Sequence, residues 1–329
     1  MVSWKEYVKR FLRYKVAIVE PTQPAVSEAS VTGIRYYYTF LKKDKPALVS
    51  LGIIGLFTLW ALIEGSFQLA AYVLHSRTLG IMLLPSNPFT LSFSNSLKPP
   101  TMYRFPVYIF GANVEGQSIL SRLLYAAPRD AFAAYIVVAS AVVIGMFVGI
   151  SAGYKGGWAD ELLMRITDAF LAFPGLVLAI ALSILIGTGF DAVLGALLVI
   201  WWPTYARFFR GQALALKGRA YVDASKLSGV GTFKIMVRHI FPNAIDPIIA
   251  IASLDFGNVI LTYSSLAFIG LGVQPPLPEW GAMSSDGLAY FPQNWWWTII
   301  PGLTIMLVVV CFTLIGDRMQ DLIGGRATY

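Results

Sequence analysis

Long apolar runs alternate with short polar stretches along this chain, and the apolar runs determine its predicted architecture. A helix that crosses a bilayer needs about 20 predominantly apolar residues. Spans are expected near Ala47–Leu74, Ala131–Ala152, Ile166–Ile186, Ala192–Ala206, Pro247–Gly270 and Trp297–Ile315. The fourth run is short, but it ends in Trp201 and Trp202, which are typical of a membrane interface. The pattern predicts an all-α polytopic membrane protein with six transmembrane helices.

A Pro-Gly pair occurs in two of these runs. Pro174 and Gly175 lie in the third run, and Pro301 and Gly302 lie in the last. Proline inside a helix removes a backbone hydrogen bond, so a kink is expected at each pair. Kinks are compatible with ordinary packing, and they are also common where helices part to form a pathway.

The distribution of Lys and Arg orients the spans, because basic residues accumulate in cytoplasmic loops. With a cytoplasmic N-terminus, the inside segments are 1–46, 154–165, 207–242 and 317–329, and they hold 20 of the 25 basic residues. The other five all fall in the first outside segment, 76–130. Both ends of the chain are therefore expected in the cytosol, and the protein is expected in the cell membrane.

The expected parts of the chain follow from these spans. They are a cytosolic tail at 1–46 with a basic amphipathic helix near 4–15, a first transmembrane helix at 47–75, an extracytoplasmic segment at 76–130, a five-helix core at 131–316 with a cytosolic loop at 207–242, and a cytosolic tail at 317–329. The segment 76–130 is expected to be a folded outer cap, with a docking surface for a substrate-delivering protein as the alternative.

Composition supports a membrane protein and excludes several other classes. The chain is 57% hydrophobic and 13% charged, against about 25% charged residues in soluble domains. Its formal charge of +7 mostly reflects topology, and the soluble basic face that a nucleic acid would require is absent. The lone Cys311 and the two separated histidines predict no disulfide and no metal site.

No phosphate-binding Gly-x-x-x-x-Gly-Lys-Ser/Thr motif occurs in the chain. The protein is therefore not expected to be an enzyme or to bind a cofactor itself. Any ATP hydrolysis linked to it must come from a separate polypeptide.

Ionisable residues within spans are the first candidates for function. Glu64, Asp168, Asp191 and Asp246 are expected near span ends, within reach of water. Asp255 lies well inside the fifth span, among apolar neighbours. We expect it to line a pathway, and a local hydrogen bond between helices is the alternative.

The most informative polar stretch runs from residue 219 to 243. It carries several charged residues, so it cannot lie in lipid and must form a surface that another molecule contacts. Asp223-Ala224-Ser225 is followed by three residues and Gly229, then by nine residues and His239-Ile-Phe-Pro242. This spacing resembles the cytoplasmic loop of permeases of binding-protein-dependent ABC importers, where Glu-Ala-Ala, Gly and Ile-x-Leu-Pro hold these positions.

The resemblance is closest to the C-type subunit of the dipeptide and oligopeptide group. It also includes the segments 121–125, 153–158, 202–217, 270–281 and 316–321, and it extends from about residue 110 to the end. It departs at 111–118, where the family's charged residues are missing. Residues 1–40 resemble nothing in the family.

This resemblance implies a type I importer fold and an ATPase-coupling role for Asp223, Ala224, Ser225, Gly229, His239 and Pro242. Gly229 is expected to end the first short helix of the loop in a left-handed conformation, and Pro242 is expected to end the second. The implied partners are a B-type permease, two cytosolic ATPase subunits that bind ATP and Mg, and an extracytoplasmic substrate-binding protein.

The resemblance implies peptide import by alternating access. Import of oligosaccharides is the alternative within the same group, because nothing in the spans distinguishes the two substrates. An ATP-independent channel or carrier and a membrane scaffold without a pathway are alternatives from other classes.

Overall fold

The computed structural model describes residues 44–323, apart from 77 and 103. Contacts divide the chain into two units, 1–40 and 41–329, and the described residues all belong to the second. The predicted amphipathic helix near 4–15 and the final residues 324–329 lie outside the described residues.

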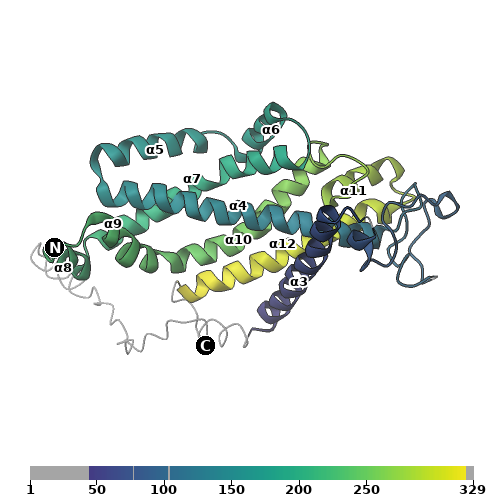
Figure 1. Cartoon of the computed structure of the whole chain (residues 1–329), viewed down its shortest axis with the longest axis horizontal. Helices are drawn as coiled ribbons and strands as arrows, with labels where there is room; N and C mark the ends of the chain where they lie inside the picture. The colour runs from purple at the N-terminus through teal and green to yellow at the C-terminus, as the bar shows by residue number, and fades with distance from the viewer. Residues whose placement is uncertain (1–43, 77, 103, 324–329) are drawn as a thin grey trace, which may run out of the picture. The chain divides into compact units, whose positions relative to one another are not determined.

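The described residues form helices and no strand. The long helices are α3 (Lys45–Val73), α4 (Ile119–Lys155), α7 (Phe190–Lys217), α10 (Phe241–Phe268) and α12 (Trp295–Ile323). The shorter ones are α5 (Gly157–Leu171), α6 (Gly175–Ile186), α8 (Ala220–Leu227), α9 (Thr232–Ile235) and α11 (Trp280–Asp286). Helices α8 and α9 lie at one end of the bundle, and α11 lies at the opposite end with the segment between α3 and α4 (Figure 1).

Five of these helices are long and apolar enough to cross a membrane, and a sixth span results if α5 and α6 count as one. A kink is expected at Pro174 and Gly175, and the structure has a complete break there, because α5 ends at Leu171 and α6 begins at Gly175. The two pieces meet at 87°, which is a sharper change of direction than the expected kink. Proline disfavours the helical conformation of the preceding residue, and this ends α5.

Two helix boundaries differ from the expected parts of the chain. Helix α4 begins at Ile119, within the expected outer segment, because the Ser118 side chain caps it by accepting from the Ser121 N–H at 3.2 Å. Helix α12 continues to Ile323. Near that end, Arg318 forms an ion pair with Asp44, which caps the start of α3. The start of α3 and the end of α12 therefore lie on the same side of the bundle, as the charge distribution predicts.

Helices α4 and α7 approach each other at backbone distance through a row of glycines on α4. A Cβ atom at Gly145 would lie 2.8 Å from the Ala206 nitrogen, and one at Gly149 would lie 2.8 Å from the Arg210 nitrogen. One turn further, a Cβ at Gly153 would lie 2.7 Å from the Arg210 carbonyl oxygen. The facing Ala206 is fully buried. Small residues spaced four apart permit this close packing of membrane helices.

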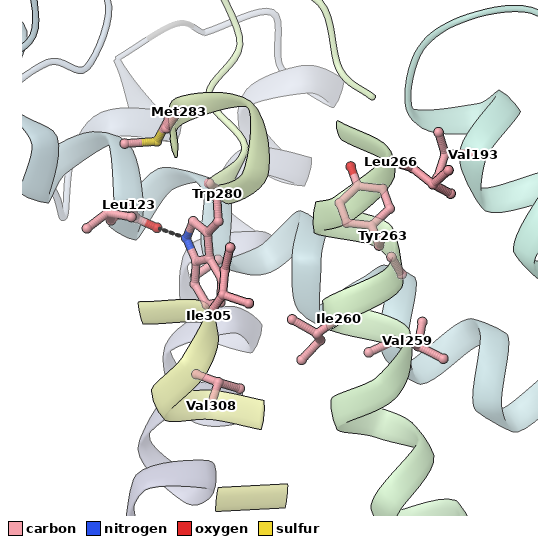
Figure 2. Packing of buried hydrophobic residues seen from close by; sticks show 14 of the residues in the cluster. Leu123, Val193, Val259, Ile260, Tyr263, Leu266, Trp280, Met283, Ile305 and Val308 are labelled. Carbon is pink, nitrogen blue, oxygen red and sulfur yellow. Dashed lines mark hydrogen bonds between the residues drawn. The ribbon is translucent and has the colours of Figure 1, made fainter. Parts of the chain in front are cut away.

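In the outer half of α4, backbone carbonyl groups near Pro128 accept hydrogen bonds from side chains of other helices. Proline has no N–H, so the carbonyl of Leu124, four residues earlier, lacks its helical partner. The indole N–H of Trp60 on α3 donates to this oxygen at 2.9 Å. Figure 2 shows the indole of Trp280 on α11 donating to the adjacent carbonyl of Leu123, at 3.0 Å. The part of α4 around Pro128 therefore binds one helix from each flanking region of the chain.

The structure corrects the expectation for Glu64, which is fully buried in the middle of α3. Gln68, one turn away on the same helix, donates to the Glu64 carboxylate at 3.2 Å and to the Tyr125 carbonyl at 3.0 Å. Water does not reach Glu64 because α3 packs against α4 at this point, where Gly65 lies close to Pro128.

A buried acidic group caps α11, and an arginine of α4 holds the loop before this helix. The Glu279 side chain is fully buried and caps α11 by accepting from the N–H groups of Gly281, at 3.0 Å, and Ala282, at 2.7 Å. Arg129 of α4 donates to the neighbouring Pro278 carbonyl at 3.2 Å. Burial raises the pKa of the Glu279 carboxyl, against the lowering effect of its two backbone hydrogen bonds and of Arg129.

Replacement of Gly149 by Ala tests the α4–α7 packing. The added methyl group has no space, so we expect a loss of about 1–3 kcal/mol of stability, measured as a lower melting temperature in detergent. The matched control is Gly55→Ala on α3, where nothing lies within 4 Å of the added carbon. Equal melting temperatures for the two variants would contradict the close approach.

Glu279→Gln tests the buried carboxyl through the pH dependence of stability. A carboxyl whose pKa is higher in the folded state contributes stability that is present at low pH and is lost as pH rises through the folded pKa. That interval extends from about 4.5, the ordinary value, to about 7. We expect the melting temperature of the wild type to fall, relative to the Gln variant, across this interval. A difference that is independent of pH would contradict the raised pKa.

Candidate functional site

The loop between α7 and α10 folds onto the inner ends of α4 and α7. Three of its apolar side chains, Val222, Ile235 and Ile240, are completely or almost completely buried. They share a core cluster with Ile150 and Tyr154 of α4 and with residues of α7. The loop is therefore an ordered surface supported by the bundle.

Gly229 ends α8 in the left-handed conformation that the sequence predicts, with φ +74°. Its N–H donates to the Lys226 carbonyl at 2.9 Å, and the Val230 N–H donates to the Ser225 carbonyl at 3.1 Å. This pair of hydrogen bonds defines a Schellman motif, in which glycine is favoured because it has no Cβ. No atom lies within 4 Å of the position that a Cβ would occupy at Gly229.

The exposed face of the loop combines small, acidic and apolar side chains. Asp223 and Ala224 are exposed, and Ser225 is half-buried. Leu227 is 90% exposed and Phe233 is 68% exposed, although both are large apolar residues. We call this face, formed by Asp223, Ala224, Ser225, Leu227, Gly229 and Phe233, the α8–α9 surface.

His239 connects the two halves of the loop. Its Nε2 lies 3.4 Å from the Ser225 hydroxyl, and its ring centroid lies 6.3 Å from that of Tyr221. Asn243 donates to its backbone carbonyl at 2.6 Å. The structure thus brings His239 and Ser225 together, although they are 14 residues apart in the sequence.

The expectation that Pro242 ends a helix is wrong. Helix α9 continues through a π-helical turn, Met236–Ile240, directly into α10, and Pro242 occupies the first turn of α10. Proline is tolerated at this position because the wider turn before it does not require its N–H. The loop is therefore joined to α10 by continuous helix.

A second connection joins α8 to the inner ends of α4 and α7. Lys226 donates to Asp223 at 2.8 Å and to the Lys217 carbonyl at 3.3 Å, and its ammonium lies 6.0 Å from the centre of the Tyr154 ring. The hydrogen bond to Asp223 raises the pKa of Lys226, so this residue stays charged. Movement of α8 would therefore act on α4, α7 and α10 together.

Two ion pairs that the sequence analysis missed attach α5 to α7. Arg210 binds Asp160 through two hydrogen bonds of 2.6 and 2.7 Å, and Arg207 binds Asp168 at 2.7 Å. The residues of each pair are about 40 to 50 positions apart in the sequence, so no local pattern indicated them. Asp168 is exposed near the end of α5, and Asp191 is exposed at the start of α7.

Asp255 lies in a groove of about 470 Å³. Its walls come from three elements. Helix α10 contributes Asp255, Asn258 and Thr262, α7 contributes Ile200, Trp201 and Thr204, and the region of the α5–α6 break contributes Phe170, Phe173 and Leu176. Asp255 is half-buried, and Asn258 donates to its carboxylate at 3.2 Å.

Two further cavities follow along α10 toward the outer end. The first, of about 290 Å³, shares Leu176 and Leu261 with the groove. The next, of about 650 Å³, shares Phe268 and Ile269 with the second cavity and is also lined by Arg122. Neighbouring cavities thus share walls from the middle of α10 to the outer loops.

The sequence is similar to one family of known proteins. Residues 141–329 match the family described as binding-protein-dependent transport system inner membrane component. The chain is 34% identical to the dipeptide transport system permease protein DppC of Alkalihalophilus pseudofirmus, over 92% of this chain and 93% of that protein. It is 37% identical to the probable D,D-dipeptide transport system permease protein DdpC of Escherichia coli, over 74% and 81%.

A third relative is the glutathione transport system permease protein GsiD of Pectobacterium atrosepticum, which is 38% identical over 64% of this chain and 70% of that protein. Among solved structures, a chain of the inward-facing methionine ABC transporter MetNI aligns with a TM-score of 0.50 and 16% identity, over 61% of this chain and 95% of that chain. At this identity the structural similarity supports the fold alone.

Proposed function

Because the chain belongs to the family of binding-protein-dependent transport system inner membrane components, we propose that it is one of two permease subunits of a peptide importer. A homologous permease of the B type forms the other half of the pathway. Two cytosolic subunits bind ATP and Mg and hydrolyse the ATP, and a binding protein delivers the peptide on the outer side. This chain contributes no catalytic residue and binds no cofactor.

The observation that carries this proposal is the α8–α9 surface. It exposes Leu227 and Phe233 at the inner end of the bundle, on a loop whose base is buried and ordered. Apolar side chains exposed in this way are typical of a protein interface. The same surface includes Asp223, Ala224 and Ser225. These residues occupy the positions of the family motif that contact the ATPase. The segment that supports the surface contains His239 and Pro242.

The proposed mechanism is alternating access between two states of the bundle. Binding of ATP closes the ATPase subunits, and the α8–α9 surface moves with them. The motion passes to α10 through the continuous helix at Pro242, and to α4 and α7 through Lys226. The groove at Asp255 and the two outer cavities are the part of the pathway that this chain contributes.

Peptides are the proposed substrate because the similar permeases are described as transporting dipeptides or glutathione. The alternative is an oligosaccharide. The ligand that co-purifies with the partner binding protein distinguishes them, because tight binding of a sugar and not of peptides would refute the peptide assignment.

Gly229→Trp tests the coupling role of the α8–α9 surface. Open space surrounds the residue, so the bundle should fold, but the bulky ring and the strained backbone should displace the surface from the ATPase. We expect ATP-driven uptake into proteoliposomes to fall at least about tenfold, because a disturbed interface loses more than about 1.4 kcal/mol.

The matched control is Gly157→Trp, at another exposed glycine with positive φ and open surroundings, which is the first residue of α5. It should retain uptake near the wild-type rate. Normal uptake by the Gly229 variant would contradict the assigned role, as would an equal loss in both variants.

A further inference from the structure

Helix α10 presents a row of polar side chains along one face. Asp255, Asn258, Thr262 and Ser265 follow each other at intervals of three or four residues, which places them on the same side of a helix. Asn258 is exposed, and the other three are half-buried. The first three line the groove, and Ser265 lines the next cavity along α10.

Asp255 has few partners for a carboxylate inside a membrane span. Its hydrogen bond within residues 44–323 is the one from Asn258, and no Lys or Arg of that part of the chain forms an ion pair with it. The hydroxyl of Tyr205 on α7 lies near the carboxylate, outside the distance and angle of a regular hydrogen bond. Neither Asn258 nor Tyr205 supplies a positive charge, and a carboxylate at this depth requires a counter-charge or water.

The remaining walls of the groove are suited to a cation. Phe170, Phe173 and Trp201 line it together with Asp255. Aromatic rings attract Lys-type ammonium and Arg-type guanidinium groups through their electron-rich faces. The hydroxyl of Thr204 and the amide of Asn258 add hydrogen-bonding groups at the same place.

We infer that the groove recognises the ammonium or guanidinium group of a basic side chain of the transported molecule, with Asp255 as its counter-charge. This inference rests on the proposed function, because the Lys and Arg side chains of a peptide carry such groups. A peptide with an additional basic side chain then passes the groove faster than one with an acidic side chain.

The test uses the complete transporter in proteoliposomes, with saturating binding protein and ATP. Initial uptake rates are measured for Ala-Lys-Ala and Ala-Glu-Ala, and the ratio of the two rates is compared between variants. The contribution of the binding protein is the same for every variant, so changes in the ratio report on the permease. We expect Asp255→Asn to lower the lysine-to-glutamate ratio about tenfold, and Asp255→Glu to keep it near the wild-type value.

Asp191→Asn is the matched control, because it removes the same charge at an exposed site outside the groove. An unchanged ratio in Asp255→Asn would overturn the inference and leave the proposed function intact. Equal slowing of both peptides, with the ratio preserved, would assign Asp255 a structural role and would also overturn it. Absence of ATP-driven uptake of either peptide by the wild type would refute the proposed function itself.

Discussion

The arrangement of the bundle depends on the contact between α4 and α7 at backbone distance. Gly145, Gly149 and Gly153 leave no room for a side chain, so the two helices are held in one register along their inner halves. Helix α7 continues into the loop that carries α8, and the inner end of α4 contacts α8 through Tyr154. In its outer half, α4 binds α3 and α11 through the carbonyl groups near Pro128. One helix thus connects the α8–α9 surface with the outer elements.

The groove lies beside the interface between α4 and α7, and not within that interface. Its walls include α7 and α10, which are connected to the α8–α9 surface, and the α5–α6 break, which is attached to α7 by the ion pairs of Arg207 and Arg210. A break at 87° gives this wall two short helices with exposed ends. A displacement of α8 therefore reaches the groove through helices that pack tightly against each other. The contacts around the groove are the ones that differ between the two states.

Several features could be predicted from the sequence because they depend on local chemistry. Apolar runs indicated the spans, Pro174 located the break in the third, and Gly229 was predicted to end α8 with positive φ. The angle of the break was not predictable, because a proline specifies where a helix ends and not the direction of the next one. Glu64 was placed near water, because the sequence does not show that α3 packs there against the part of α4 around Pro128, more than 60 positions away. Asp255 was identified from the sequence as an ionisable residue within a span, but the aromatic walls of its groove come from helices that only the fold brings together.

We expect α8 and α4 to move as one body when ATP binds. Spin labels at Ala220→Cys on α8 and Phe147→Cys on α4, both exposed positions, measure this in the assembled transporter with Cys311 replaced by Ser. The α8–α4 distance should change by no more than about 2 Å on ATP binding, because Tyr154 and the close α4–α7 contact connect the two helices. A clearly larger change would contradict the shared movement of α8 and α4.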